Sequence, residues 1–281
     1  MAATPRHKAS DKQAVLKKLL PILKKHYKST APKYDLPILE TMIYAICLEN
    51  ASCEQADAAQ ERIDELFHDY NEMRVSSISE LNRAFEGMDS PELRSLRIRS
   101  VLHHVFEANY EFEFEGLRRK TLELATKQLN KIRDLSPFVK NFTLQHALGS
   151  HLVPIDDAMN NPVKWLGLVE PELSPEDASE SLKSAVRKSD GPLFCHFIRC
   201  LAHDPKLAEA LGPDVEITEE DEIDLDTAPA RLKDLLESKP RKKSAKSAAK
   251  KTSKSRTSKA SGSKNGAGKT KKKTKKSASS R

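Results

Sequence analysis

The sequence predicts an all-α fold, and three observations support this prediction. Apolar residues recur at spacings of three and four along most of the first 203 residues, which is the period of an amphipathic helix. Several of these segments follow residues that commonly begin helices. The one alternating stretch, residues 110–115, has no second strand to pair with. We therefore expect residues 110–115 to form an arm packed on helices.

The expected helices can be followed in order. The first covers residues 11–28, where Pro21 interrupts the apolar pattern. Ser77, Ser90 and Ser174 stand before acidic or proline-containing first turns, so we expect helices to begin there. The other helical segments are 36–48, 55–67, 79–86, 92–106, 117–132, 138–148, 158–168, 174–187 and 193–203, with a short helix at 228–238.

Charge divides the chain into two parts. Residues 239–281 contain 18 of the 48 Lys and Arg residues and none of the 41 acids, so residues 1–238 carry 30 basic and 41 acidic side chains, a formal charge of −11. The C-terminal part has too little apolar surface to offset the entropy cost of ordering, so we expect it to be disordered. The expected organisation is a disordered N-terminus (1–10), a helical domain (11–212), an acidic linker with a short helix (213–238) and a disordered Lys-rich tail (239–281).

The lysine-rich tail predicts binding to DNA. Each phosphate that a lysine neutralises releases counterions, which gives sequence-independent and salt-dependent affinity. Its composition resembles the tails of linker histones, and the expected contacts include Lys242, Lys243, Lys272 and Lys273. The alternative is a tail that keeps the protein soluble or binds acidic proteins.

The rest of the composition indicates an intracellular protein. Only four cysteines occur, the N-terminal residues lack an apolar signal core, and no apolar run is long enough to cross a membrane. We therefore expect reduced thiols and a location in a nucleoid or a nucleus, and the sequence does not distinguish these two.

Residues 132–159 are the most informative stretch of the chain. A helix end is followed by Leu135-Ser136-Pro137-Phe138-Val139, an apolar helix, a loop, and then Asp156 and Asp157 after Val153-Pro154-Ile155. A carboxylate that begins a helix is held by free backbone N–H groups and by the helix dipole. The pattern thus predicts a charged and fixed aspartate at the start of a helix.

This layout resembles the helix-hairpin-helix DNA glycosylases of the endonuclease III superfamily. In that family a Leu-Pro-Gly-Val-Gly-type hairpin precedes an aspartate that heads a helix, and here residues 135–139 and Ile155-Asp156 take these places. Upstream, Glu49 takes the place of a glutamine that probes the DNA gap, next to Asn50. The resemblance covers residues 11–212 and implies a two-lobed, endonuclease III-like helical fold.

The resemblance implies glycosylase chemistry through Asp156, with Asp157 as the fallback, because a carboxylate stabilises the positive charge that builds on the sugar. The alternative is that Asp156 only caps a helix. The lysine that makes some relatives abasic-site lyases falls on Asn141, and Lys140 points about 100° away around the helix. We therefore expect a monofunctional or catalytically inactive protein.

The hairpin also departs from the family pattern. Pro137 and Val139 replace both glycines, so the expected DNA contacts at Pro137, Phe138, Val139 and Lys140 should grip a phosphate weakly. Glu49 would turn a negative charge toward the phosphates, and Asn50 would lie beside it.

Cofactor and metal sites are expected to be absent. Relatives that hold an iron–sulfur cluster use four closely spaced C-terminal cysteines, and only Cys195 and Cys200 lie in that region. His196, Cys200 and His203 share one helical face, which suggests either zinc or, as we favour, a core helix. The arginines at positions 94, 97 and 99 suggest either phosphate contacts or, as we favour, a solvated helix face.

The sequence therefore leaves two functions. The first is a DNA-binding protein that resembles a base-excision-repair glycosylase, with catalysis through Asp156 uncertain. The second is a non-enzymatic, linker-histone-like protein that compacts DNA and whose acidic core contacts other proteins.

Overall fold

Helices make up all the regular secondary structure of the described residues, which confirms the all-α prediction. The computed structural model describes residues 7–212, 215, 217–218 and 223–237. In chain order the elements are α1 (Ala9–Tyr27), α2 (Ile38–Leu48), α3 (Cys53–Leu66), α4 (Tyr70–Val75), α5 (Ile78–Leu81), η1 (Asn82–Phe85), α6 (Pro91–Asn109), η2 (Glu115–Arg119), α7 (Leu122–Leu129), α8 (Pro137–Leu148), α9 (Asp157–Trp165), α10 (Pro175–Lys183), α11 (Gly191–Ala202), α12 (Ala208–Leu211) and α13 (Ala228–Glu237).

Side-chain caps begin three of the helices as the sequence predicts. Ser77 and Glu80 form a reciprocal capping box at α5, and the Ser174 hydroxyl accepts a hydrogen bond from Asp177 N at α10. Asp156 accepts a hydrogen bond from Met159 N and begins α9. Ser90 differs, because its backbone is left-handed (φ 51°) and its side chain makes no cap; Pro91 at the first helical position begins α6 instead.

Two local predictions were wrong, and two short helices were missed. Pro21 does not interrupt α1, which continues through it while Val15, Leu19 and Leu23 remain buried on one face. Residues 117–132 do not form one helix, because the Thr121 hydroxyl accepts a hydrogen bond from Leu124 N and starts α7 separately from η2. The short helices α4 and α12 were not predicted, since six and four residues are too few to show a helical period.

The 110–115 segment is not extended along its length. Tyr110 adopts a left-handed backbone (φ 57°) that ends α6, and its side chain is 79% exposed. Phe112 packs against the core and Phe114 is buried. The segment is thus an arm on the helices, as expected, but its aromatic side chains do not share one face.

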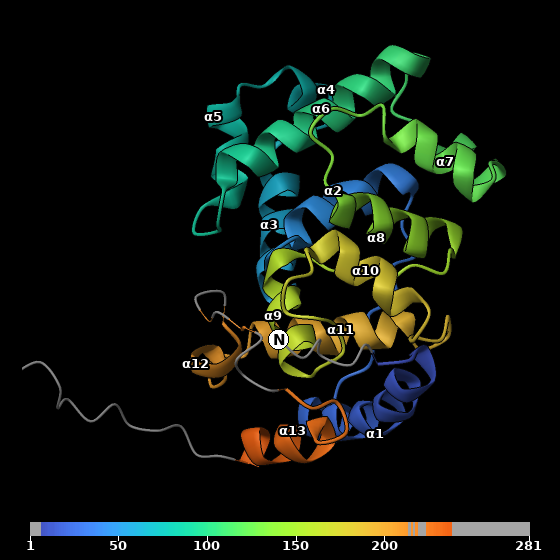
Figure 1. Cartoon of the computed structure of the whole chain (residues 1–281). Helices are drawn as coiled ribbons and strands as arrows, with labels where there is room; N and C mark the ends of the chain where they lie inside the picture. The colour runs from blue at the N-terminus through green and yellow to red at the C-terminus, as the bar shows by residue number, and fades with distance from the viewer. Residues whose placement is uncertain (1–6, 213–214, 216, 219–222, 238–281) are drawn as a thin grey trace, which may run out of the picture. The chain divides into compact units, whose positions relative to one another are not determined.

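Contacts within the unit Met1–Pro240 arrange the described helices in two groups (Figure 1). In the first group α2 packs on α3, α6 and α8, while α4 and α5 pack on α6 and α7 packs on α8. In the second group α9 packs on α10, α11 and α12, and α1 packs on α11 and α13. The N-terminal helix therefore joins the C-terminal helices, and the segment between them forms the other lobe.

The two groups meet where α2 ends. The loop after α2 lies against the start of α9 and against α11, through contacts between residues more than 100 positions apart. The residues singled out in the sequence around Glu49 and Asp156 are therefore brought together by the fold. The tail lysines at 242, 243, 272 and 273 lie outside the described residues.

Candidate functional site

Asp156 lies at the junction of the two groups of helices with both carboxylate oxygens engaged. Oδ1 accepts a hydrogen bond from Met159 N at 2.9 Å, and Oδ2 accepts one from Asn50 N at 3.0 Å. Oδ2 also forms an ion pair with Arg199 Nη2 at 2.9 Å, and the side chain of Asp156 is 1% exposed. The carboxylate is thus fixed, as the sequence predicts, and it is also paired with a buried cation.

Arg199 on α11 is the main partner of this aspartate. Besides the ion pair, its Nη1 donates to the carbonyl oxygens of Leu48 (2.7 Å) and Ala51 (2.8 Å). The guanidinium lies 5.1 Å from the ring centroid of Phe138 at the start of α8, and its side chain is 5% exposed. A single arginine therefore links the end of α2, the start of α8, α9 and α11.

Arg94 on α6 serves the same end of α2 from another side. Its guanidinium donates to the carbonyl oxygens of Ile46 (2.6 Å), Cys47 (3.1 Å) and Glu49 (2.5 Å). The last carbonyls of a helix have no hydrogen-bond donor inside the helix. Arg94 and Arg199 supply donors to these carbonyls at the end of α2, where water would otherwise be needed. The sequence suggested that Arg94 either contacts phosphate or lies on a solvated helix face. Both interpretations were wrong, because Arg94 is 4% exposed and has a structural role.

Glu49 does not present its charge to a DNA strand. Its side chain is 10% exposed and forms an ion pair with Arg97. Burial raises the pKa of Glu49, and the positive charge of Arg97 opposes this effect. The expectation that Glu49 faces phosphates was therefore wrong, because α6 supplies a cation that draws the carboxylate inward.

Asn50 closes the loop against α9. Its backbone is left-handed (φ 51°), its side-chain Oδ1 accepts a hydrogen bond from Ala158 N at 3.1 Å, and its Nδ2 donates to Asp157 Oδ2 at 3.3 Å. Asp157 itself is exposed, and its carboxylate accepts this single hydrogen bond from the described residues. Asp157, rather than Asp156, is thus the carboxylate that solvent reaches at this site.

The hairpin side chains mostly point into the protein. Phe138 is 3% exposed and Val139 is fully buried, while Pro137 takes the first helical position of α8 and has no N–H to offer. Val139 N donates to the Ser136 hydroxyl at 3.1 Å. The amide that a phosphate would need is therefore already bonded, and the predicted DNA contacts at Phe138 and Val139 are corrected to core positions.

The position of the lyase lysine carries no amine. Asn141 Nδ2 donates to Ser179 Oγ on α10 at 3.3 Å. Lys140 turns elsewhere, and its Nζ donates to Asn130 Oδ1 at 2.9 Å. Among the described residues, neither Asn141 nor Lys140 therefore supplies an amine at the place where a Schiff base would form.

The cavity beside Arg199 is too small for a nucleobase. It holds about 20 Å³ and is lined by Tyr34, Phe138, Phe142 and His146, among others. This volume accommodates about one water molecule. Burial lowers the pKa of His146 to about 4, so the imidazole is neutral near pH 7.

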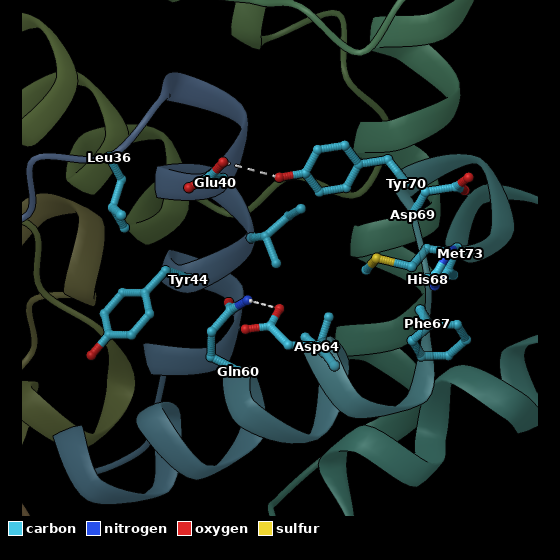
Figure 2. A pocket seen from close by; sticks show the side chains of 12 residues that line it. Leu36, Glu40, Tyr44, Gln60, Asp64, Phe67, His68, Asp69, Tyr70 and Met73 are labelled. Carbon is cyan, nitrogen blue, oxygen red and sulfur yellow. Dashed lines mark hydrogen bonds between the residues drawn. The ribbon is translucent and has the colours of Figure 1, made fainter.

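A larger hollow of about 590 Å³ lies between α2, α3 and α4, and Figure 2 shows its lining. Glu40 accepts a hydrogen bond from the Tyr70 hydroxyl at 3.2 Å, and Asp64 accepts one from Gln60 at 3.0 Å. Asp69 also lines it. Three carboxylates without a lining Lys or Arg repel phosphate, so this hollow is unsuited to nucleic acid.

The four free cysteines lie on three helices. Cys47 is buried in α2 and Cys53 begins α3, whereas Cys195 and Cys200 lie on α11. His196 Nε2 lies 3.1 Å from Ser29 Oγ and 3.7 Å from Cys200 Sγ. Within the described residues no group of three or more His, Cys, Asp or Glu side chains is arranged to hold a metal ion.

The sequence interpretation missed Arg199 as the partner of Asp156. One signal was available, because Arg199 stands in the apolar helix GPLFCHFIRCLA, where a lone arginine needs a buried partner. The identity of that partner, 43 positions earlier, has no local signal.

Among the described helices none is both long and apolar enough to cross a bilayer.

Comparison with known proteins identifies the fold. The sequence matches no family model and no curated protein. The structure is similar to a trapped endonuclease III–DNA covalent intermediate, the estranged-adenine complex, with a TM-score of 0.54 and 13% identity over 70% of this chain and 86% of that one. It is also similar to a non-covalent endonuclease III–DNA complex, with a TM-score of 0.57 and 12% identity over 81% of this chain and 100% of that one. This chain therefore has a divergent endonuclease III-like fold.

Proposed function

We propose that this protein binds DNA inside the cell and does not use Asp156 to cleave N-glycosidic bonds. The observation that carries the second part is the closure of the Asp156 carboxylate by Asn50 N, Met159 N and Arg199. Glycosidic cleavage needs a negative charge that faces the sugar. The Asp156 carboxylate is 1% exposed and paired with Arg199, so its charge stabilises the fold and does not face a ligand.

The proposal for DNA binding rests on charge and on the fold together. The tail concentrates 18 basic side chains in 43 residues, whereas residues 1–238 carry a formal −11. Such a tail binds phosphates with strong salt dependence. The two endonuclease III structures compared above are complexes with DNA. We propose Lys242, Lys243, Lys272 and Lys273 among the contacts, and no cofactor is needed for this role.

A monofunctional glycosylase is the second candidate function, and one observation favours it. Asp157 lies next to Asp156 at the same helix start, and solvent reaches it. It could orient water toward a sugar if DNA opened the cavity beside Arg199. A lyase is disfavoured, because Asn141 cannot form a Schiff base.

Two measurements with the full-length protein test the proposal. The first compares binding to a duplex with and without an abasic-site analogue, for the wild type and a variant with all 18 tail Lys and Arg residues replaced by Gln. We expect the wild type to bind both duplexes and the variant to lose most of this affinity at physiological salt. Equal affinity of both proteins would contradict the role of the tail.

The second measurement follows base release from duplexes that contain uracil, a mismatched thymine or alkylated purines. We expect no release by the wild type. Release that Asp157→Asn abolishes would support the second candidate function. Release that a folded Asp156→Asn variant lacks would overturn the proposal that Asp156 is not catalytic. A covalent adduct trapped by borohydride would show that an amine other than one at position 141 reacts.

A further inference from the structure

A basic hollow lies on the described part of the protein outside the site around Asp156. It occupies about 810 Å³ between the end of α4, the C-terminal half of α6 and the loop before α8. Four cations line it, namely Arg74, Arg99, Lys131 and Arg133, and the lining carboxylates are Glu107 and Asp134. The formal charge of the lining is therefore +2 with His103 and His104 neutral, on a body whose formal charge is −11.

Three of these cations have no partner among the residues that the structure describes. Arg99, Lys131 and Arg133 make no side-chain hydrogen bond or ion pair to any described residue, and Lys131 and Arg133 are exposed. Unpaired cations that converge on one hollow repel one another, which costs stability in the absence of an anion. A ligand with negative charge would remove this cost.

The loop that carries Lys131 and Arg133 is fixed to α6. Arg97 Nε donates to the Asp134 carbonyl oxygen at 3.0 Å, and the Ser100 hydroxyl donates to Asp134 Oδ2 at 3.4 Å. Asp134 is held in a left-handed backbone (φ 62°) that a non-glycine residue rarely adopts. Because Asp134 makes the contacts that fix this loop, Lys131 and Arg133 are held beside Arg99 without forming ion pairs of their own.

Arg74 is positioned on the other wall. Its guanidinium lies 4.3 Å from the ring centroid of Phe106, and Nη2 donates to Asn71 Oδ1 at 2.8 Å. The stacked guanidinium retains N–H donors for a further acceptor. Arg74 therefore adds a preorganised cation to the three unpaired ones.

We propose that this basic hollow binds the phosphodiester backbone of duplex DNA as a second contact, separate from the tail. Arginine and lysine heads at an open surface suit phosphate oxygens, and the mixed geometry offers no pattern for reading base edges. The proposal rests on the proposed function in taking DNA as the ligand. It adds that the endonuclease III-like core itself holds DNA, on the outside of α6 rather than at Asp156.

The test uses the full-length triple variant R99Q/K131Q/R133Q. A matched variant, K17Q/K18Q/K25Q, removes three exposed charges from α1, which lies at the opposite end of the described helices in Figure 1. Affinity for an undamaged duplex is measured from low to physiological salt. We expect the slope of log affinity against log salt to fall by about 2 to 3 in the hollow variant, with at least about tenfold weaker binding at 0.1 M salt, and by less than about 1 in the α1 variant.

A charge-conserving variant guards against misfolding. Because R99K/R133K keeps the positive charges, it should keep the slope of the wild type. None of the three variants should unfold at a lower temperature than the wild type. Equal slopes in the hollow and α1 variants would overturn this inference and leave tail-driven binding intact. No duplex binding by the wild type would overturn the proposed function instead. A hollow variant that loses affinity for polyglutamate but not for DNA would assign the surface to acidic proteins and also overturn the inference.

Discussion

Arg94 and Arg99 lie five positions apart on α6 and serve opposite purposes. Arg94 is 4% exposed and donates to the backbone carbonyls where α2 ends, whereas Arg99 lines the basic hollow and donates to no described residue. Five residues turn a helix by about 140° beyond a full turn, so the two side chains leave the helix on different faces. The residue type alone therefore does not tell which cation serves the fold and which is free for a ligand.

The same contrast separates the two regions around these arginines. In the buried region, Arg94 and Arg199 satisfy carbonyls at the negative end of the α2 dipole, and Arg199 also pairs with Asp156. In the open region, Arg99, Lys131 and Arg133 lie together without a hydrogen-bond or ion-pair partner among the described residues. Buried charges need partners because desolvation is costly. Exposed charges remain hydrated, so they can stay unpaired until a ligand binds.

The largest expected effect is at Arg199. Arg199→Met should lower the free energy of unfolding by about 3–5 kcal/mol, because it leaves the buried Asp156 charge without a counter-ion and two carbonyls without their donor. Urea denaturation measures the change. As a control, Arg119→Met at an exposed position should change stability by less than about 0.5 kcal/mol. A loss below about 1 kcal/mol at Arg199 would show that the junction does not depend on this ion pair.

The buried region should also respond to pH through His146. Its ring packs 4.3 Å from Phe142 and 4.8 Å from Tyr34, and burial lowers its pKa from 6.5 to about 4. The unfolded chain therefore binds a proton between pH 6.5 and 4 that the folded chain does not, so the stabilising contribution is present above pH 6.5 and is lost as pH falls. The loss should reach about 3 kcal/mol near pH 4, as an upper bound.

His146→Phe keeps an aromatic ring and removes the titrating group. We expect the stability of this variant, measured by urea denaturation from pH 7 to 4, to decrease less than that of the wild type. Parallel curves for the two proteins would mean that the pKa of His146 is the same in the folded and the unfolded chain.

Substitutions on α6 compare the two regions directly. Arg94→Met should cost about 2–3 kcal/mol, since it leaves buried carbonyls without donors. Arg99→Met should change stability by less than about 0.5 kcal/mol and should weaken DNA binding instead. The free energy of unfolding and the affinity for DNA can both be measured on the same preparations of the two variants. Similar stability losses at both positions would remove the distinction between buried and free arginines.

The smallest expected effect is at Arg74. Arg74→Met removes the guanidinium from the face of Phe106 and should cost about 0.5–1 kcal/mol. Arg83→Met, at an exposed position on η1, provides the matched control and should be close to neutral. Thermal unfolding of the two variants side by side resolves a difference of this size. No difference between them would leave Arg74 positioned by Asn71 alone.

The sequence by itself determined the helical class and several helix starts. The apolar period, the capping serines at 77 and 174, and the aspartate at 156 all act through residues within four positions of one another. The charge of the tail is likewise a property of composition. Patterns of this kind can be read from the sequence because the interactions behind them are local.

Only the tertiary structure decided which of these residues are available to a ligand. Asn50, Asp156 and Arg199 come together across 149 positions, and Glu49 meets Arg97 across 48. Phe138 and Val139 became core residues because α8 packs on α2 and α7. The free cations Arg99, Lys131 and Arg133 converge because a strained turn at Asp134 is tied to α6. A charge acquires its role from partners that the fold supplies over long separations, and no local pattern encodes those partners.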